Sequence, residues 1–384
     1  MQRTKIKLVA ELKQHTPLIH FQVDQAGATL RATEVKPKLD HFLLNLEGAD
    51  QYETRLKNAK DNGWLVGQGA HPALDYQLRI VDLSAKEERK DKRKIKLITE
   101  NDKNSIFSSG KIELSVLCFH EGLLDLIWQH LEAFFVLHNF GTRQNKGWGC
   151  FYLVETTKER FTKLLTQTKR AFKRWTVAEN NWIRQVDVDH RRMKSGVNHS
   201  SFAGAVGNQK GYEKSKLRNY FQNHGINWDK AKFKQEILAS PRFDFKLRRN
   251  RQNPHDIQQG TNFKYVRALL GLAEHYEFQT EGHYMPKYKL KVNGGDIQRF
   301  KSPLTFKVFQ GDRYTNIYLL VEEIPDAMFE HVFNFKLGTR SMQAGGEADD
   351  DNFEDLLTLK TPKKSEIDLI DFVRTCGLPY NYLQ

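Results

Sequence analysis

The segment of residues 123–138 has the strongest helical periodicity in the chain. Its apolar residues recur at intervals of three and four, a spacing that places side chains on one face of a helix. The residues of this face are Leu124, Ile127, Leu131, Phe134 and Phe135. We therefore predict a helix that faces the core and that ends where the polar and glycine-containing residues 139–141 begin.

The rest of the first 155 residues predicts a mixture of strands and one further helix. The helix is expected over residues 30–44, where Pro37 marks a later start or a kink. Alternating apolar positions predict strands at residues 5–12, 17–22, 75–82, 111–119 and 148–154. The resulting order is close to a ferredoxin-like βαββαβ unit with one extra strand.

After residue 155 the pattern of apolar and charged residues changes twice. Residues 156–240 predict a largely helical, basic segment, and the mixed pattern then returns. It includes a helix at 262–273 and strands at 243–247, 288–292, 304–309 and 316–321. Residues 342–352, rich in Gly and Asp, predict a flexible linker before a terminal helix at 365–375.

These patterns predict an α+β protein with two tandem ferredoxin-like domains and a helical basic insertion. The predicted parts are an N-terminal domain (1–155), the insertion (156–240), a second domain (241–340) and an acidic linker with a C-terminal helix (341–384).

Composition excludes several classes of protein. Hydrophobic residues make up 39% of the 384 residues, which is too many for a wholly disordered chain. No apolar run reaches the roughly 18 residues of a membrane helix, and the N-terminus has no secretory signal. The three cysteines show no paired spacing, which favours a reducing, cytoplasmic location and predicts neither a zinc site nor another cofactor.

The charge distribution favours a polyanionic partner. The formal net charge is +13, and residues 158–218 hold 15 Lys and Arg against 5 Asp and Glu. Acidic residues gather near the end, between Glu347 and Asp355. A basic protein without a specific partner remains the alternative.

A glycine-bounded basic loop between the strongest helix and the following strand is the main candidate site. Glycines allow positive φ and close backbone approach to a phosphate, and the cations supply charge. Trp148 is expected to stack on a base or a ribose. The candidate residues are Gly141, Arg143, Asn145, Lys146, Gly147, Trp148 and Gly149. An ordinary helix-to-strand turn with solvated polar residues is the alternative.

Two further basic segments are candidates for RNA contact. Arg31, Lys36 and Lys38 surround a predicted helix start, where backbone N–H groups attract phosphate. The alternative interpretation is a capped helix with ordinary surface charges. Arg248, Arg249 and Arg251 follow a predicted strand and would line an RNA path or occupy a solvated turn.

Several of these segments together resemble the RAMP superfamily, the ferredoxin-like RNA-binding proteins of CRISPR systems. The resemblance is carried by residues 15–18 (His-Thr-Pro-Leu), by Gly27 with Leu30 and Arg31, and by the 141–149 loop. Residues 299–306 are similar to the Ser-Pro-Leu strand of the first subunit of the Cmr-type, type III-B effector complex. The resemblance implies tandem ferredoxin-like domains, guide or target RNA as ligand, and other RAMP subunits as partners.

The resemblance leaves three functions to compare. The first is binding of the RNA backbone, without catalysis. The second is metal-independent cleavage of repeat RNA, for which His15 would act as the base and Lys146 would stabilise the phosphorane. The third is an assembly subunit that touches little RNA.

Overall fold

The computed structural model forms two compact units that interleave along the chain. The first comprises Met1–Val186, Thr305–Leu319 and Asn381–Gln384, and the second Asp187–Leu304 and Leu320–Tyr380. The mixture of helices and strands confirms the predicted α+β class, whereas the predicted domain boundaries stay predictions. The structure describes residues 1–19, 30–46, 51–67, 73–83, 106–107, 111–167, 171–174, 177–178, 181–198, 212–240, 260–278, 287–311, 314–343, 346–349 and 352–383.

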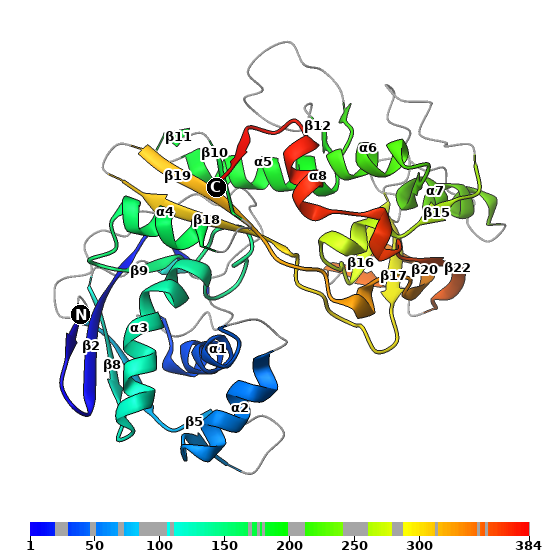
Figure 1. Ribbon diagram of the computed structural model, residues 1–384. Helices are drawn as coiled ribbons and strands as arrows, with labels where there is room; N and C mark the ends of the chain where they lie inside the picture. The colour runs from blue at the N-terminus through cyan, green and yellow to red at the C-terminus, as the bar shows by residue number, and fades with distance from the viewer. Residues whose placement is uncertain are drawn as a thin grey trace. The chain divides into compact units, whose positions relative to one another are not determined.

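The main sheet of the first unit is antiparallel and has its helices α1 and α3 on one face (Figure 1). Strand β2 lies between β8 and β9, β8 pairs with β6, and β1 adds to the edge of β2. Along the chain, the strands of this sheet and the two helices follow in the order β1-β2-α1-β6-β8-α3-β9, with shorter elements between them. The elements are β1 (Gln2–Arg3), β2 (Lys7–Gln14), α1 (Ala32–Leu44), β6 (Gln77–Asp82), β8 (Ile112–Leu117), α3 (Glu121–Leu137) and β9 (Phe151–Leu153).

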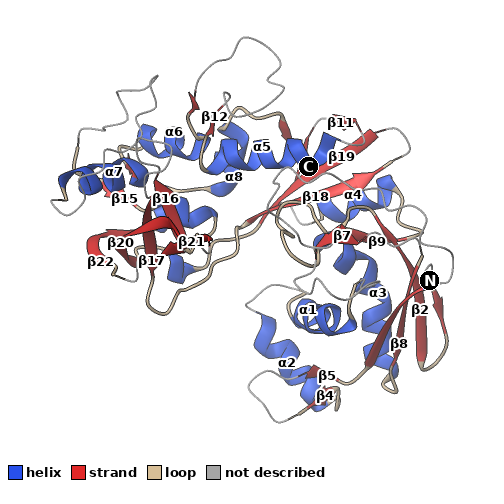
Figure 2. Cartoon of the chain, turned by 180° about the vertical axis from the view of Figure 1, so that it is seen from behind, coloured by secondary structure: helices blue, strands red, loops and turns tan. Residues whose placement is uncertain are grey.

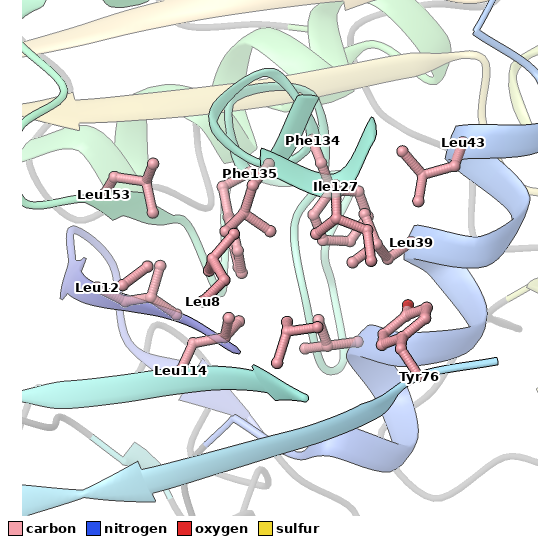
Figure 3. Close-up of a cluster of buried hydrophobic side chains, with 14 of the residues drawn as sticks. Leu8, Leu12, Leu39, Leu43, Tyr76, Leu114, Ile127, Phe134, Phe135 and Leu153 are labelled. Atoms are coloured by element: carbon pink, nitrogen blue, oxygen red, sulfur yellow. The ribbon is translucent and has the colours of Figure 1, made fainter. Parts of the chain in front are cut away.

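The core of this unit lies between the sheet and the two helices. Leu8 and Leu12 of β2 and Leu114 of β8 point from the sheet toward α3, because side chains alternate between the faces of a strand (Figure 3). The predicted apolar face of α3 is buried throughout, so that prediction is confirmed. At about 25 cal/mol per Å² of apolar surface, such burial is the main source of stability in the unit.

The smaller elements of the first unit surround this core. They are β3 (Leu18–Ile19), α2 (Tyr52–Asp61), β4 (Leu65–Val66), β5 (Ala73–Leu74), β7 (Ile106–Phe107) and α4 (Lys158–Thr166). A second sheet has the order β11-β19-β10-β23, with β18 paired to β19. Its strands are β10 (Ala171–Arg174), β11 (Val177–Ala178), β18 (Leu304–Gln310), β19 (Tyr314–Val321) and β23 (Tyr380–Tyr382).

The second unit contains a sheet of order β16-β17-β20-β21, with β22 paired to β20 and helix α7 packed nearby (Figure 2). Its strands are β12 (Val197–Asn198), β13 (Tyr212–Glu213), β14 (Asn227–Trp228), β15 (Phe263–Lys264), β16 (His275–Phe278), β17 (Lys287–Asn293), β20 (Val332–Gln343), β21 (Gly346–Asp349) and β22 (Glu354–Lys360). Its helices are α6 (Lys216–Asn223), α7 (Asp229–Ala239), α8 (Leu369–Thr375) and the 3₁₀ turns η5 (Val266–Leu270), η6 (Asp326–Met328) and η7 (Lys364–Glu366). Helix α5 (Trp182–Lys194) begins in the first unit and ends in the second.

Two predictions for the second half were wrong. Residues 262–273 do not form an α-helix but β15 and the buried 3₁₀ turn η5, which ends at Gly271 with φ of +101°. Most of the expected linker at 342–352 pairs instead as β20 with β21, because backbone hydrogen bonds form a ladder whatever the side chains are. The predicted strand at 243–247 lies outside the described residues.

Other element predictions were right in kind but shifted at their ends. Pro37 lies inside α1, which begins at Ala32. The terminal helix starts later than expected, at Leu369, where the Asp368 carboxylate accepts hydrogen bonds from the amides of Ile370 and Asp371. The basic segment 156–240 contains α4, α5, α6 and α7, but short strands separate these helices.

A buried lysine joins β18 to the end of α3 within the first unit. Lys307 is fully buried, and its ammonium donates to the carbonyl oxygens of Phe135 and His138 at 3.2 and 2.7 Å. It also donates to Asn139 Oδ1 at 2.6 Å. The last carbonyl groups of a helix have no partner within the helix and carry partial negative charge. Lys307 satisfies them from a strand about 170 residues later in the chain.

We expect Lys307→Met to destabilise the first unit by about 3 kcal/mol, because buried carbonyl groups would lose their donor. Hydrogen exchange of the α3 amides measures this loss directly. Lys163→Met, at an exposed lysine of the same unit, is the control and should change stability by less than about 0.5 kcal/mol. Equal effects of the two substitutions would contradict the proposed role of Lys307.

Candidate nucleic-acid interface

The loop of residues 141–149 lies between α3 and β9, as predicted, and its glycine amides are bonded to the protein. Gly141 N–H donates to Glu34 Oε1 at 2.7 Å, and Gly149 N–H donates to the Pro17 carbonyl oxygen at 2.9 Å. Gly147 N–H donates to the Gln144 carbonyl oxygen at 3.3 Å. The expected mechanism, in which these amides cradle a phosphate, therefore does not fit this loop.

The three glycines have positive φ and pack too closely against their neighbours for a side chain. A Cβ on Gly141 would lie 2.6 Å from Leu18 Cδ1, and one on Gly147 would lie 2.8 Å from Val308 Cγ2. A Cβ on Gly149 would overlap the Phe140 carbonyl oxygen. The glycines thus allow close packing of the loop against its own unit, rather than close approach of a ligand.

Asn139 fixes the start of the loop with all of its polar side-chain groups. Its amide donates to the carbonyl oxygens of Gln144 at 2.6 Å and Phe306 at 2.9 Å. Its Oδ1 accepts from the Lys307 ammonium and from the Cys150 thiol. From the sequence, Asn139 was predicted only to be part of a helix stop. A lysine inside the apolar run of residues 304–309 was the signal that a buried polar network lay here.

The loop side chains fall into a buried and an exposed group. Trp148 is only 3% exposed and packs edge-on against Trp182 at 5.5 Å, so the prediction that it stacks on a base does not fit. Asn145 and Lys146 lie against β18, where the Asn145 carbonyl accepts from the Phe306 amide at 2.9 Å. Arg143 is exposed and adopts φ of +57°.

The cations predicted at the start of α1 differ in their surroundings. Lys36 donates to Asp40 and to the Leu74 carbonyl oxygen at 2.9 and 2.8 Å, and its ammonium lies 4.2 Å from the centre of the Tyr76 ring. Lys36 therefore helps to pack α1 against its neighbours. The expectation that Lys36 neutralises phosphate does not fit these contacts. Arg31 is half-buried at the first position before the helix.

Lys38 and Glu34 join α1 to the loop. Lys38 Nζ donates to Glu34 Oε1 at 2.9 Å, to the Asn139 carbonyl oxygen at 3.1 Å and to Gln144 Oε1 at 3.1 Å. Glu34 also accepts from Gly141 N–H. The structure therefore brings the helix start that carries Arg31 together with the loop that carries Arg143. Arg248, Arg249 and Arg251 lie outside the described residues.

His15, the candidate base for RNA cleavage, is buried in the first unit. Burial, together with the nearby charges of Lys13 and Lys307, lowers the pKa of His15 to about 3. Its Nδ1 accepts from the Gln310 amide at 3.0 Å, and its ring packs against Tyr152 and Phe309. A base with so low a pKa and no exposed edge is poorly suited to take a proton from a ribose hydroxyl at neutral pH.

The described residues lack two kinds of feature. Within these ranges, no group of three or more His, Cys, Asp or Glu side chains could hold a metal ion. No described helix is long and apolar enough to cross a membrane.

Comparison with known proteins identifies the family. A family profile described as the Cmr1 N-terminal domain matches residues 5–197, and one described as the Cmr1 C-terminal domain matches residues 212–381. The chain belongs to the Cmr1 family. As a Cmr1-family protein it is a Cmr-type RAMP protein of type III-B CRISPR defence, as the sequence resemblance indicated.

The Cmr1 family is also represented among similar solved structures. The crystal structure of Cmr1 from Pyrococcus furiosus in its apo form matches 84% of this chain and 90% of its own, with 13% identity and a TM-score of 0.38. A search of curated proteins gives no match.

We expect Gly149→Ala to destabilise this Cmr1-family chain by more than about 3 kcal/mol, because strain from positive φ adds to a clash with backbone. Gly63→Ala is the matched control, since Gly63 has φ of +69° and a Cβ there would meet no described atom within 4 Å. It should cost only about 1 kcal/mol. Urea denaturation measures both, and a similar loss in the two variants would show that packing around the loop is unimportant.

We also expect the Cmr1-family chain to lose stability in mild acid because of His15. Between pH 6.5 and pH 3 the unfolded chain binds a proton that the folded chain does not, so stability falls as pH falls. The loss from pH 7.5 to pH 5.0 is about 2 kcal/mol, at about 1.4 kcal/mol per pH unit below 6.5.

Urea denaturation at the two pH values, compared between wild type and His15→Gln, tests this assignment. His15→Gln should remove about 2 kcal/mol of the stability loss between pH 7.5 and pH 5.0. This expectation holds even if the variant is less stable than wild type at pH 7.5. An unchanged pH dependence in His15→Gln would show that His15 is not the group responsible.

Proposed function

We propose that this Cmr1-family chain binds the phosphate backbone of guide RNA, target RNA or their duplex within a type III-B effector complex. The binding residues are the side chains around the loop, above all Arg143, with Lys146 and Arg31. The net charge of +13 and the basic segment 158–218 support a polyanionic ligand. Contacts to phosphate position an RNA without reading its sequence.

The conformation of Arg143 is the observation that carries this proposal. Among the described residues, Arg143 and Glu330 are the non-glycine residues with positive φ. That conformation costs an L-residue about 1–2 kcal/mol relative to the right-handed region. Glycine would adopt it freely, yet the chain keeps an exposed arginine there, at the surface of a loop that its own unit holds rigidly. Backbone strain at such a position favours a functional role.

The interactions of α1 support the same site. Glu34 and Lys38 hold the start of α1 beside the loop, so the positive end of the helix dipole and Arg31 belong to one surface with Arg143. Side chains held by a rigid scaffold lose less entropy when they bind a ligand.

The proposal includes a finer architecture and further partners. We infer two tandem ferredoxin-like domains, for which the strand order of the first unit and the two family profiles are the support. Other RAMP subunits of the effector complex are the proposed protein partners. The buried position of His15 and its low pKa favour RNA binding over RNA cleavage.

We expect Arg143→Gly to weaken RNA binding while leaving stability unchanged or raising it by up to about 1 kcal/mol. Fluorescence anisotropy with a labelled single-stranded RNA, over a range of salt concentrations, measures affinity. Adding Lys146→Gln should flatten the plot of log affinity against log salt by about 1.4 in total, at about 0.7 per lost phosphate contact.

The matched control is Glu330→Gly, which relieves the same kind of backbone strain at φ of +54° and removes no cation. It should leave RNA affinity unchanged. Arg143→Ala separates charge from strain, because it removes the guanidinium and keeps the strained backbone. An RNA affinity that is unaltered in both Arg143 variants would refute the proposed site.

A further inference from the structure

The sheet of the second unit has one apolar and one cationic face. In β17, Tyr288 and Leu290 are fully buried, whereas Lys289 is half-buried and Lys291 is exposed. Because side chains alternate along a strand, the two lysines share the face opposite the core. In β20, Lys336 alternates in the same way with the buried Phe335 and Leu337.

The pairing of β17 with β20 places cationic residues directly opposite one another. Lys291 is the register partner of Lys336. Like charges at directly opposed positions destabilise a sheet. The Lys291–Lys336 pair is therefore not explained by stability, and a bound polyanion would turn this repulsion into a favourable interaction.

Carboxylates lie beside these lysines, on the neighbouring strands β16 and β22. Glu277 of β16 is the register partner of Lys289, and Asp355 of β22 lies 3.5 Å from Lys336. The Lys336 and Asp355 side chains are 45% and 82% exposed, so their ion pair contributes little. The carboxylates thus lie on the flanking strands, and the lysines lie on the central pair.

An aromatic ring lies within the same face. The Lys291 ammonium is 3.6 Å from the centre of the Phe353 ring, and the ring packs over Gly338, where a Cβ would come within 2.8 Å of it. Gly338 is in turn the register partner of Lys289. The ring therefore holds one of the lysines at a fixed place between the two strands.

We propose that this face of the second unit, made of Lys289, Lys291, Lys336 and Phe353, binds single-stranded RNA along its backbone. It is a second RNA site, distinct from the loop of the first unit, and it rests on the proposed RNA-binding function. Lysines at alternate residues of β17 give charges about 7 Å apart in a row. Sheet surfaces that bind single strands combine such rows of cations with aromatic rings, which favours RNA over an acidic protein segment.

The triple variant Lys289→Gln/Lys291→Gln/Lys336→Gln in the full chain tests this proposal. We expect it to bind a labelled single-stranded RNA of mixed sequence at least ten-fold more weakly than wild type. The salt slope should flatten by about 2, for three lost phosphate contacts. Its melting temperature should equal or exceed that of wild type, because one opposed pair of like charges is removed.

The matched control is Lys232→Gln/Lys301→Gln/Lys364→Gln, which removes three lysines of the same unit that are each paired with a carboxylate. It should leave RNA affinity within two-fold of wild type. Equal losses in the two triple variants, or no loss in the first, would overturn the second site. Competition by polyglutamate that is as strong as competition by unlabelled RNA would instead assign the face to an acidic protein.

The loop variants separate this proposal from the first. If wild type binds RNA and only Arg143→Gly weakens binding, the loop site stands and the sheet site is refuted. If only the sheet variant weakens binding, the reverse holds. If wild type does not bind RNA, both proposals fail.

Discussion

The ammonium group of Lys307 joins the end of α3, Asn139 and β18 in the first unit. Near the end of α3 the Phe135 carbonyl group is buried, and a buried polar group without a partner is destabilising. Lys307 supplies donors to two of these carbonyl groups and to Asn139. These bonds join β18 to the first unit, although β18 follows most of the second unit in the chain.

The loop takes its shape from the same contacts. Once β18 lies beside Asn139, the Phe306 backbone bonds to both Asn139 and Asn145, and Val308 closes over Gly147. The glycine amides of the loop are then hydrogen-bonded within the protein. A ligand would therefore contact the exposed side chains of the loop. A glycine-rich loop is often taken as a backbone cradle for phosphate. Here the glycines hold a surface on which an arginine is displayed.

Local patterns in the sequence were enough to predict several of the longer helices and strands. The spacing of apolar residues gave α3 and its buried face, and alternation gave β2, β8 and β17. The partners of Lys307 and Asn139 could not be predicted, because those bonds join residues about 170 positions apart and leave no periodic signal. The pairing of β20 with β21 was missed for another reason, because β21 (Gly346–Asp349) has no alternating apolar residues that would indicate a strand.

Both proposed RNA sites keep cationic residues where stability alone would disfavour them, but the physical origins differ. At Arg143 the unfavourable contribution is conformational and does not depend on salt, because it comes from backbone sterics. Between β17 and β20 it is electrostatic, so it weakens as salt screens the opposed lysines. Affinity at both sites would fall with salt, whereas only the sheet would gain stability as salt rises. A polyanion would therefore stabilise the second unit most at low ionic strength, where the unliganded sheet is least stable.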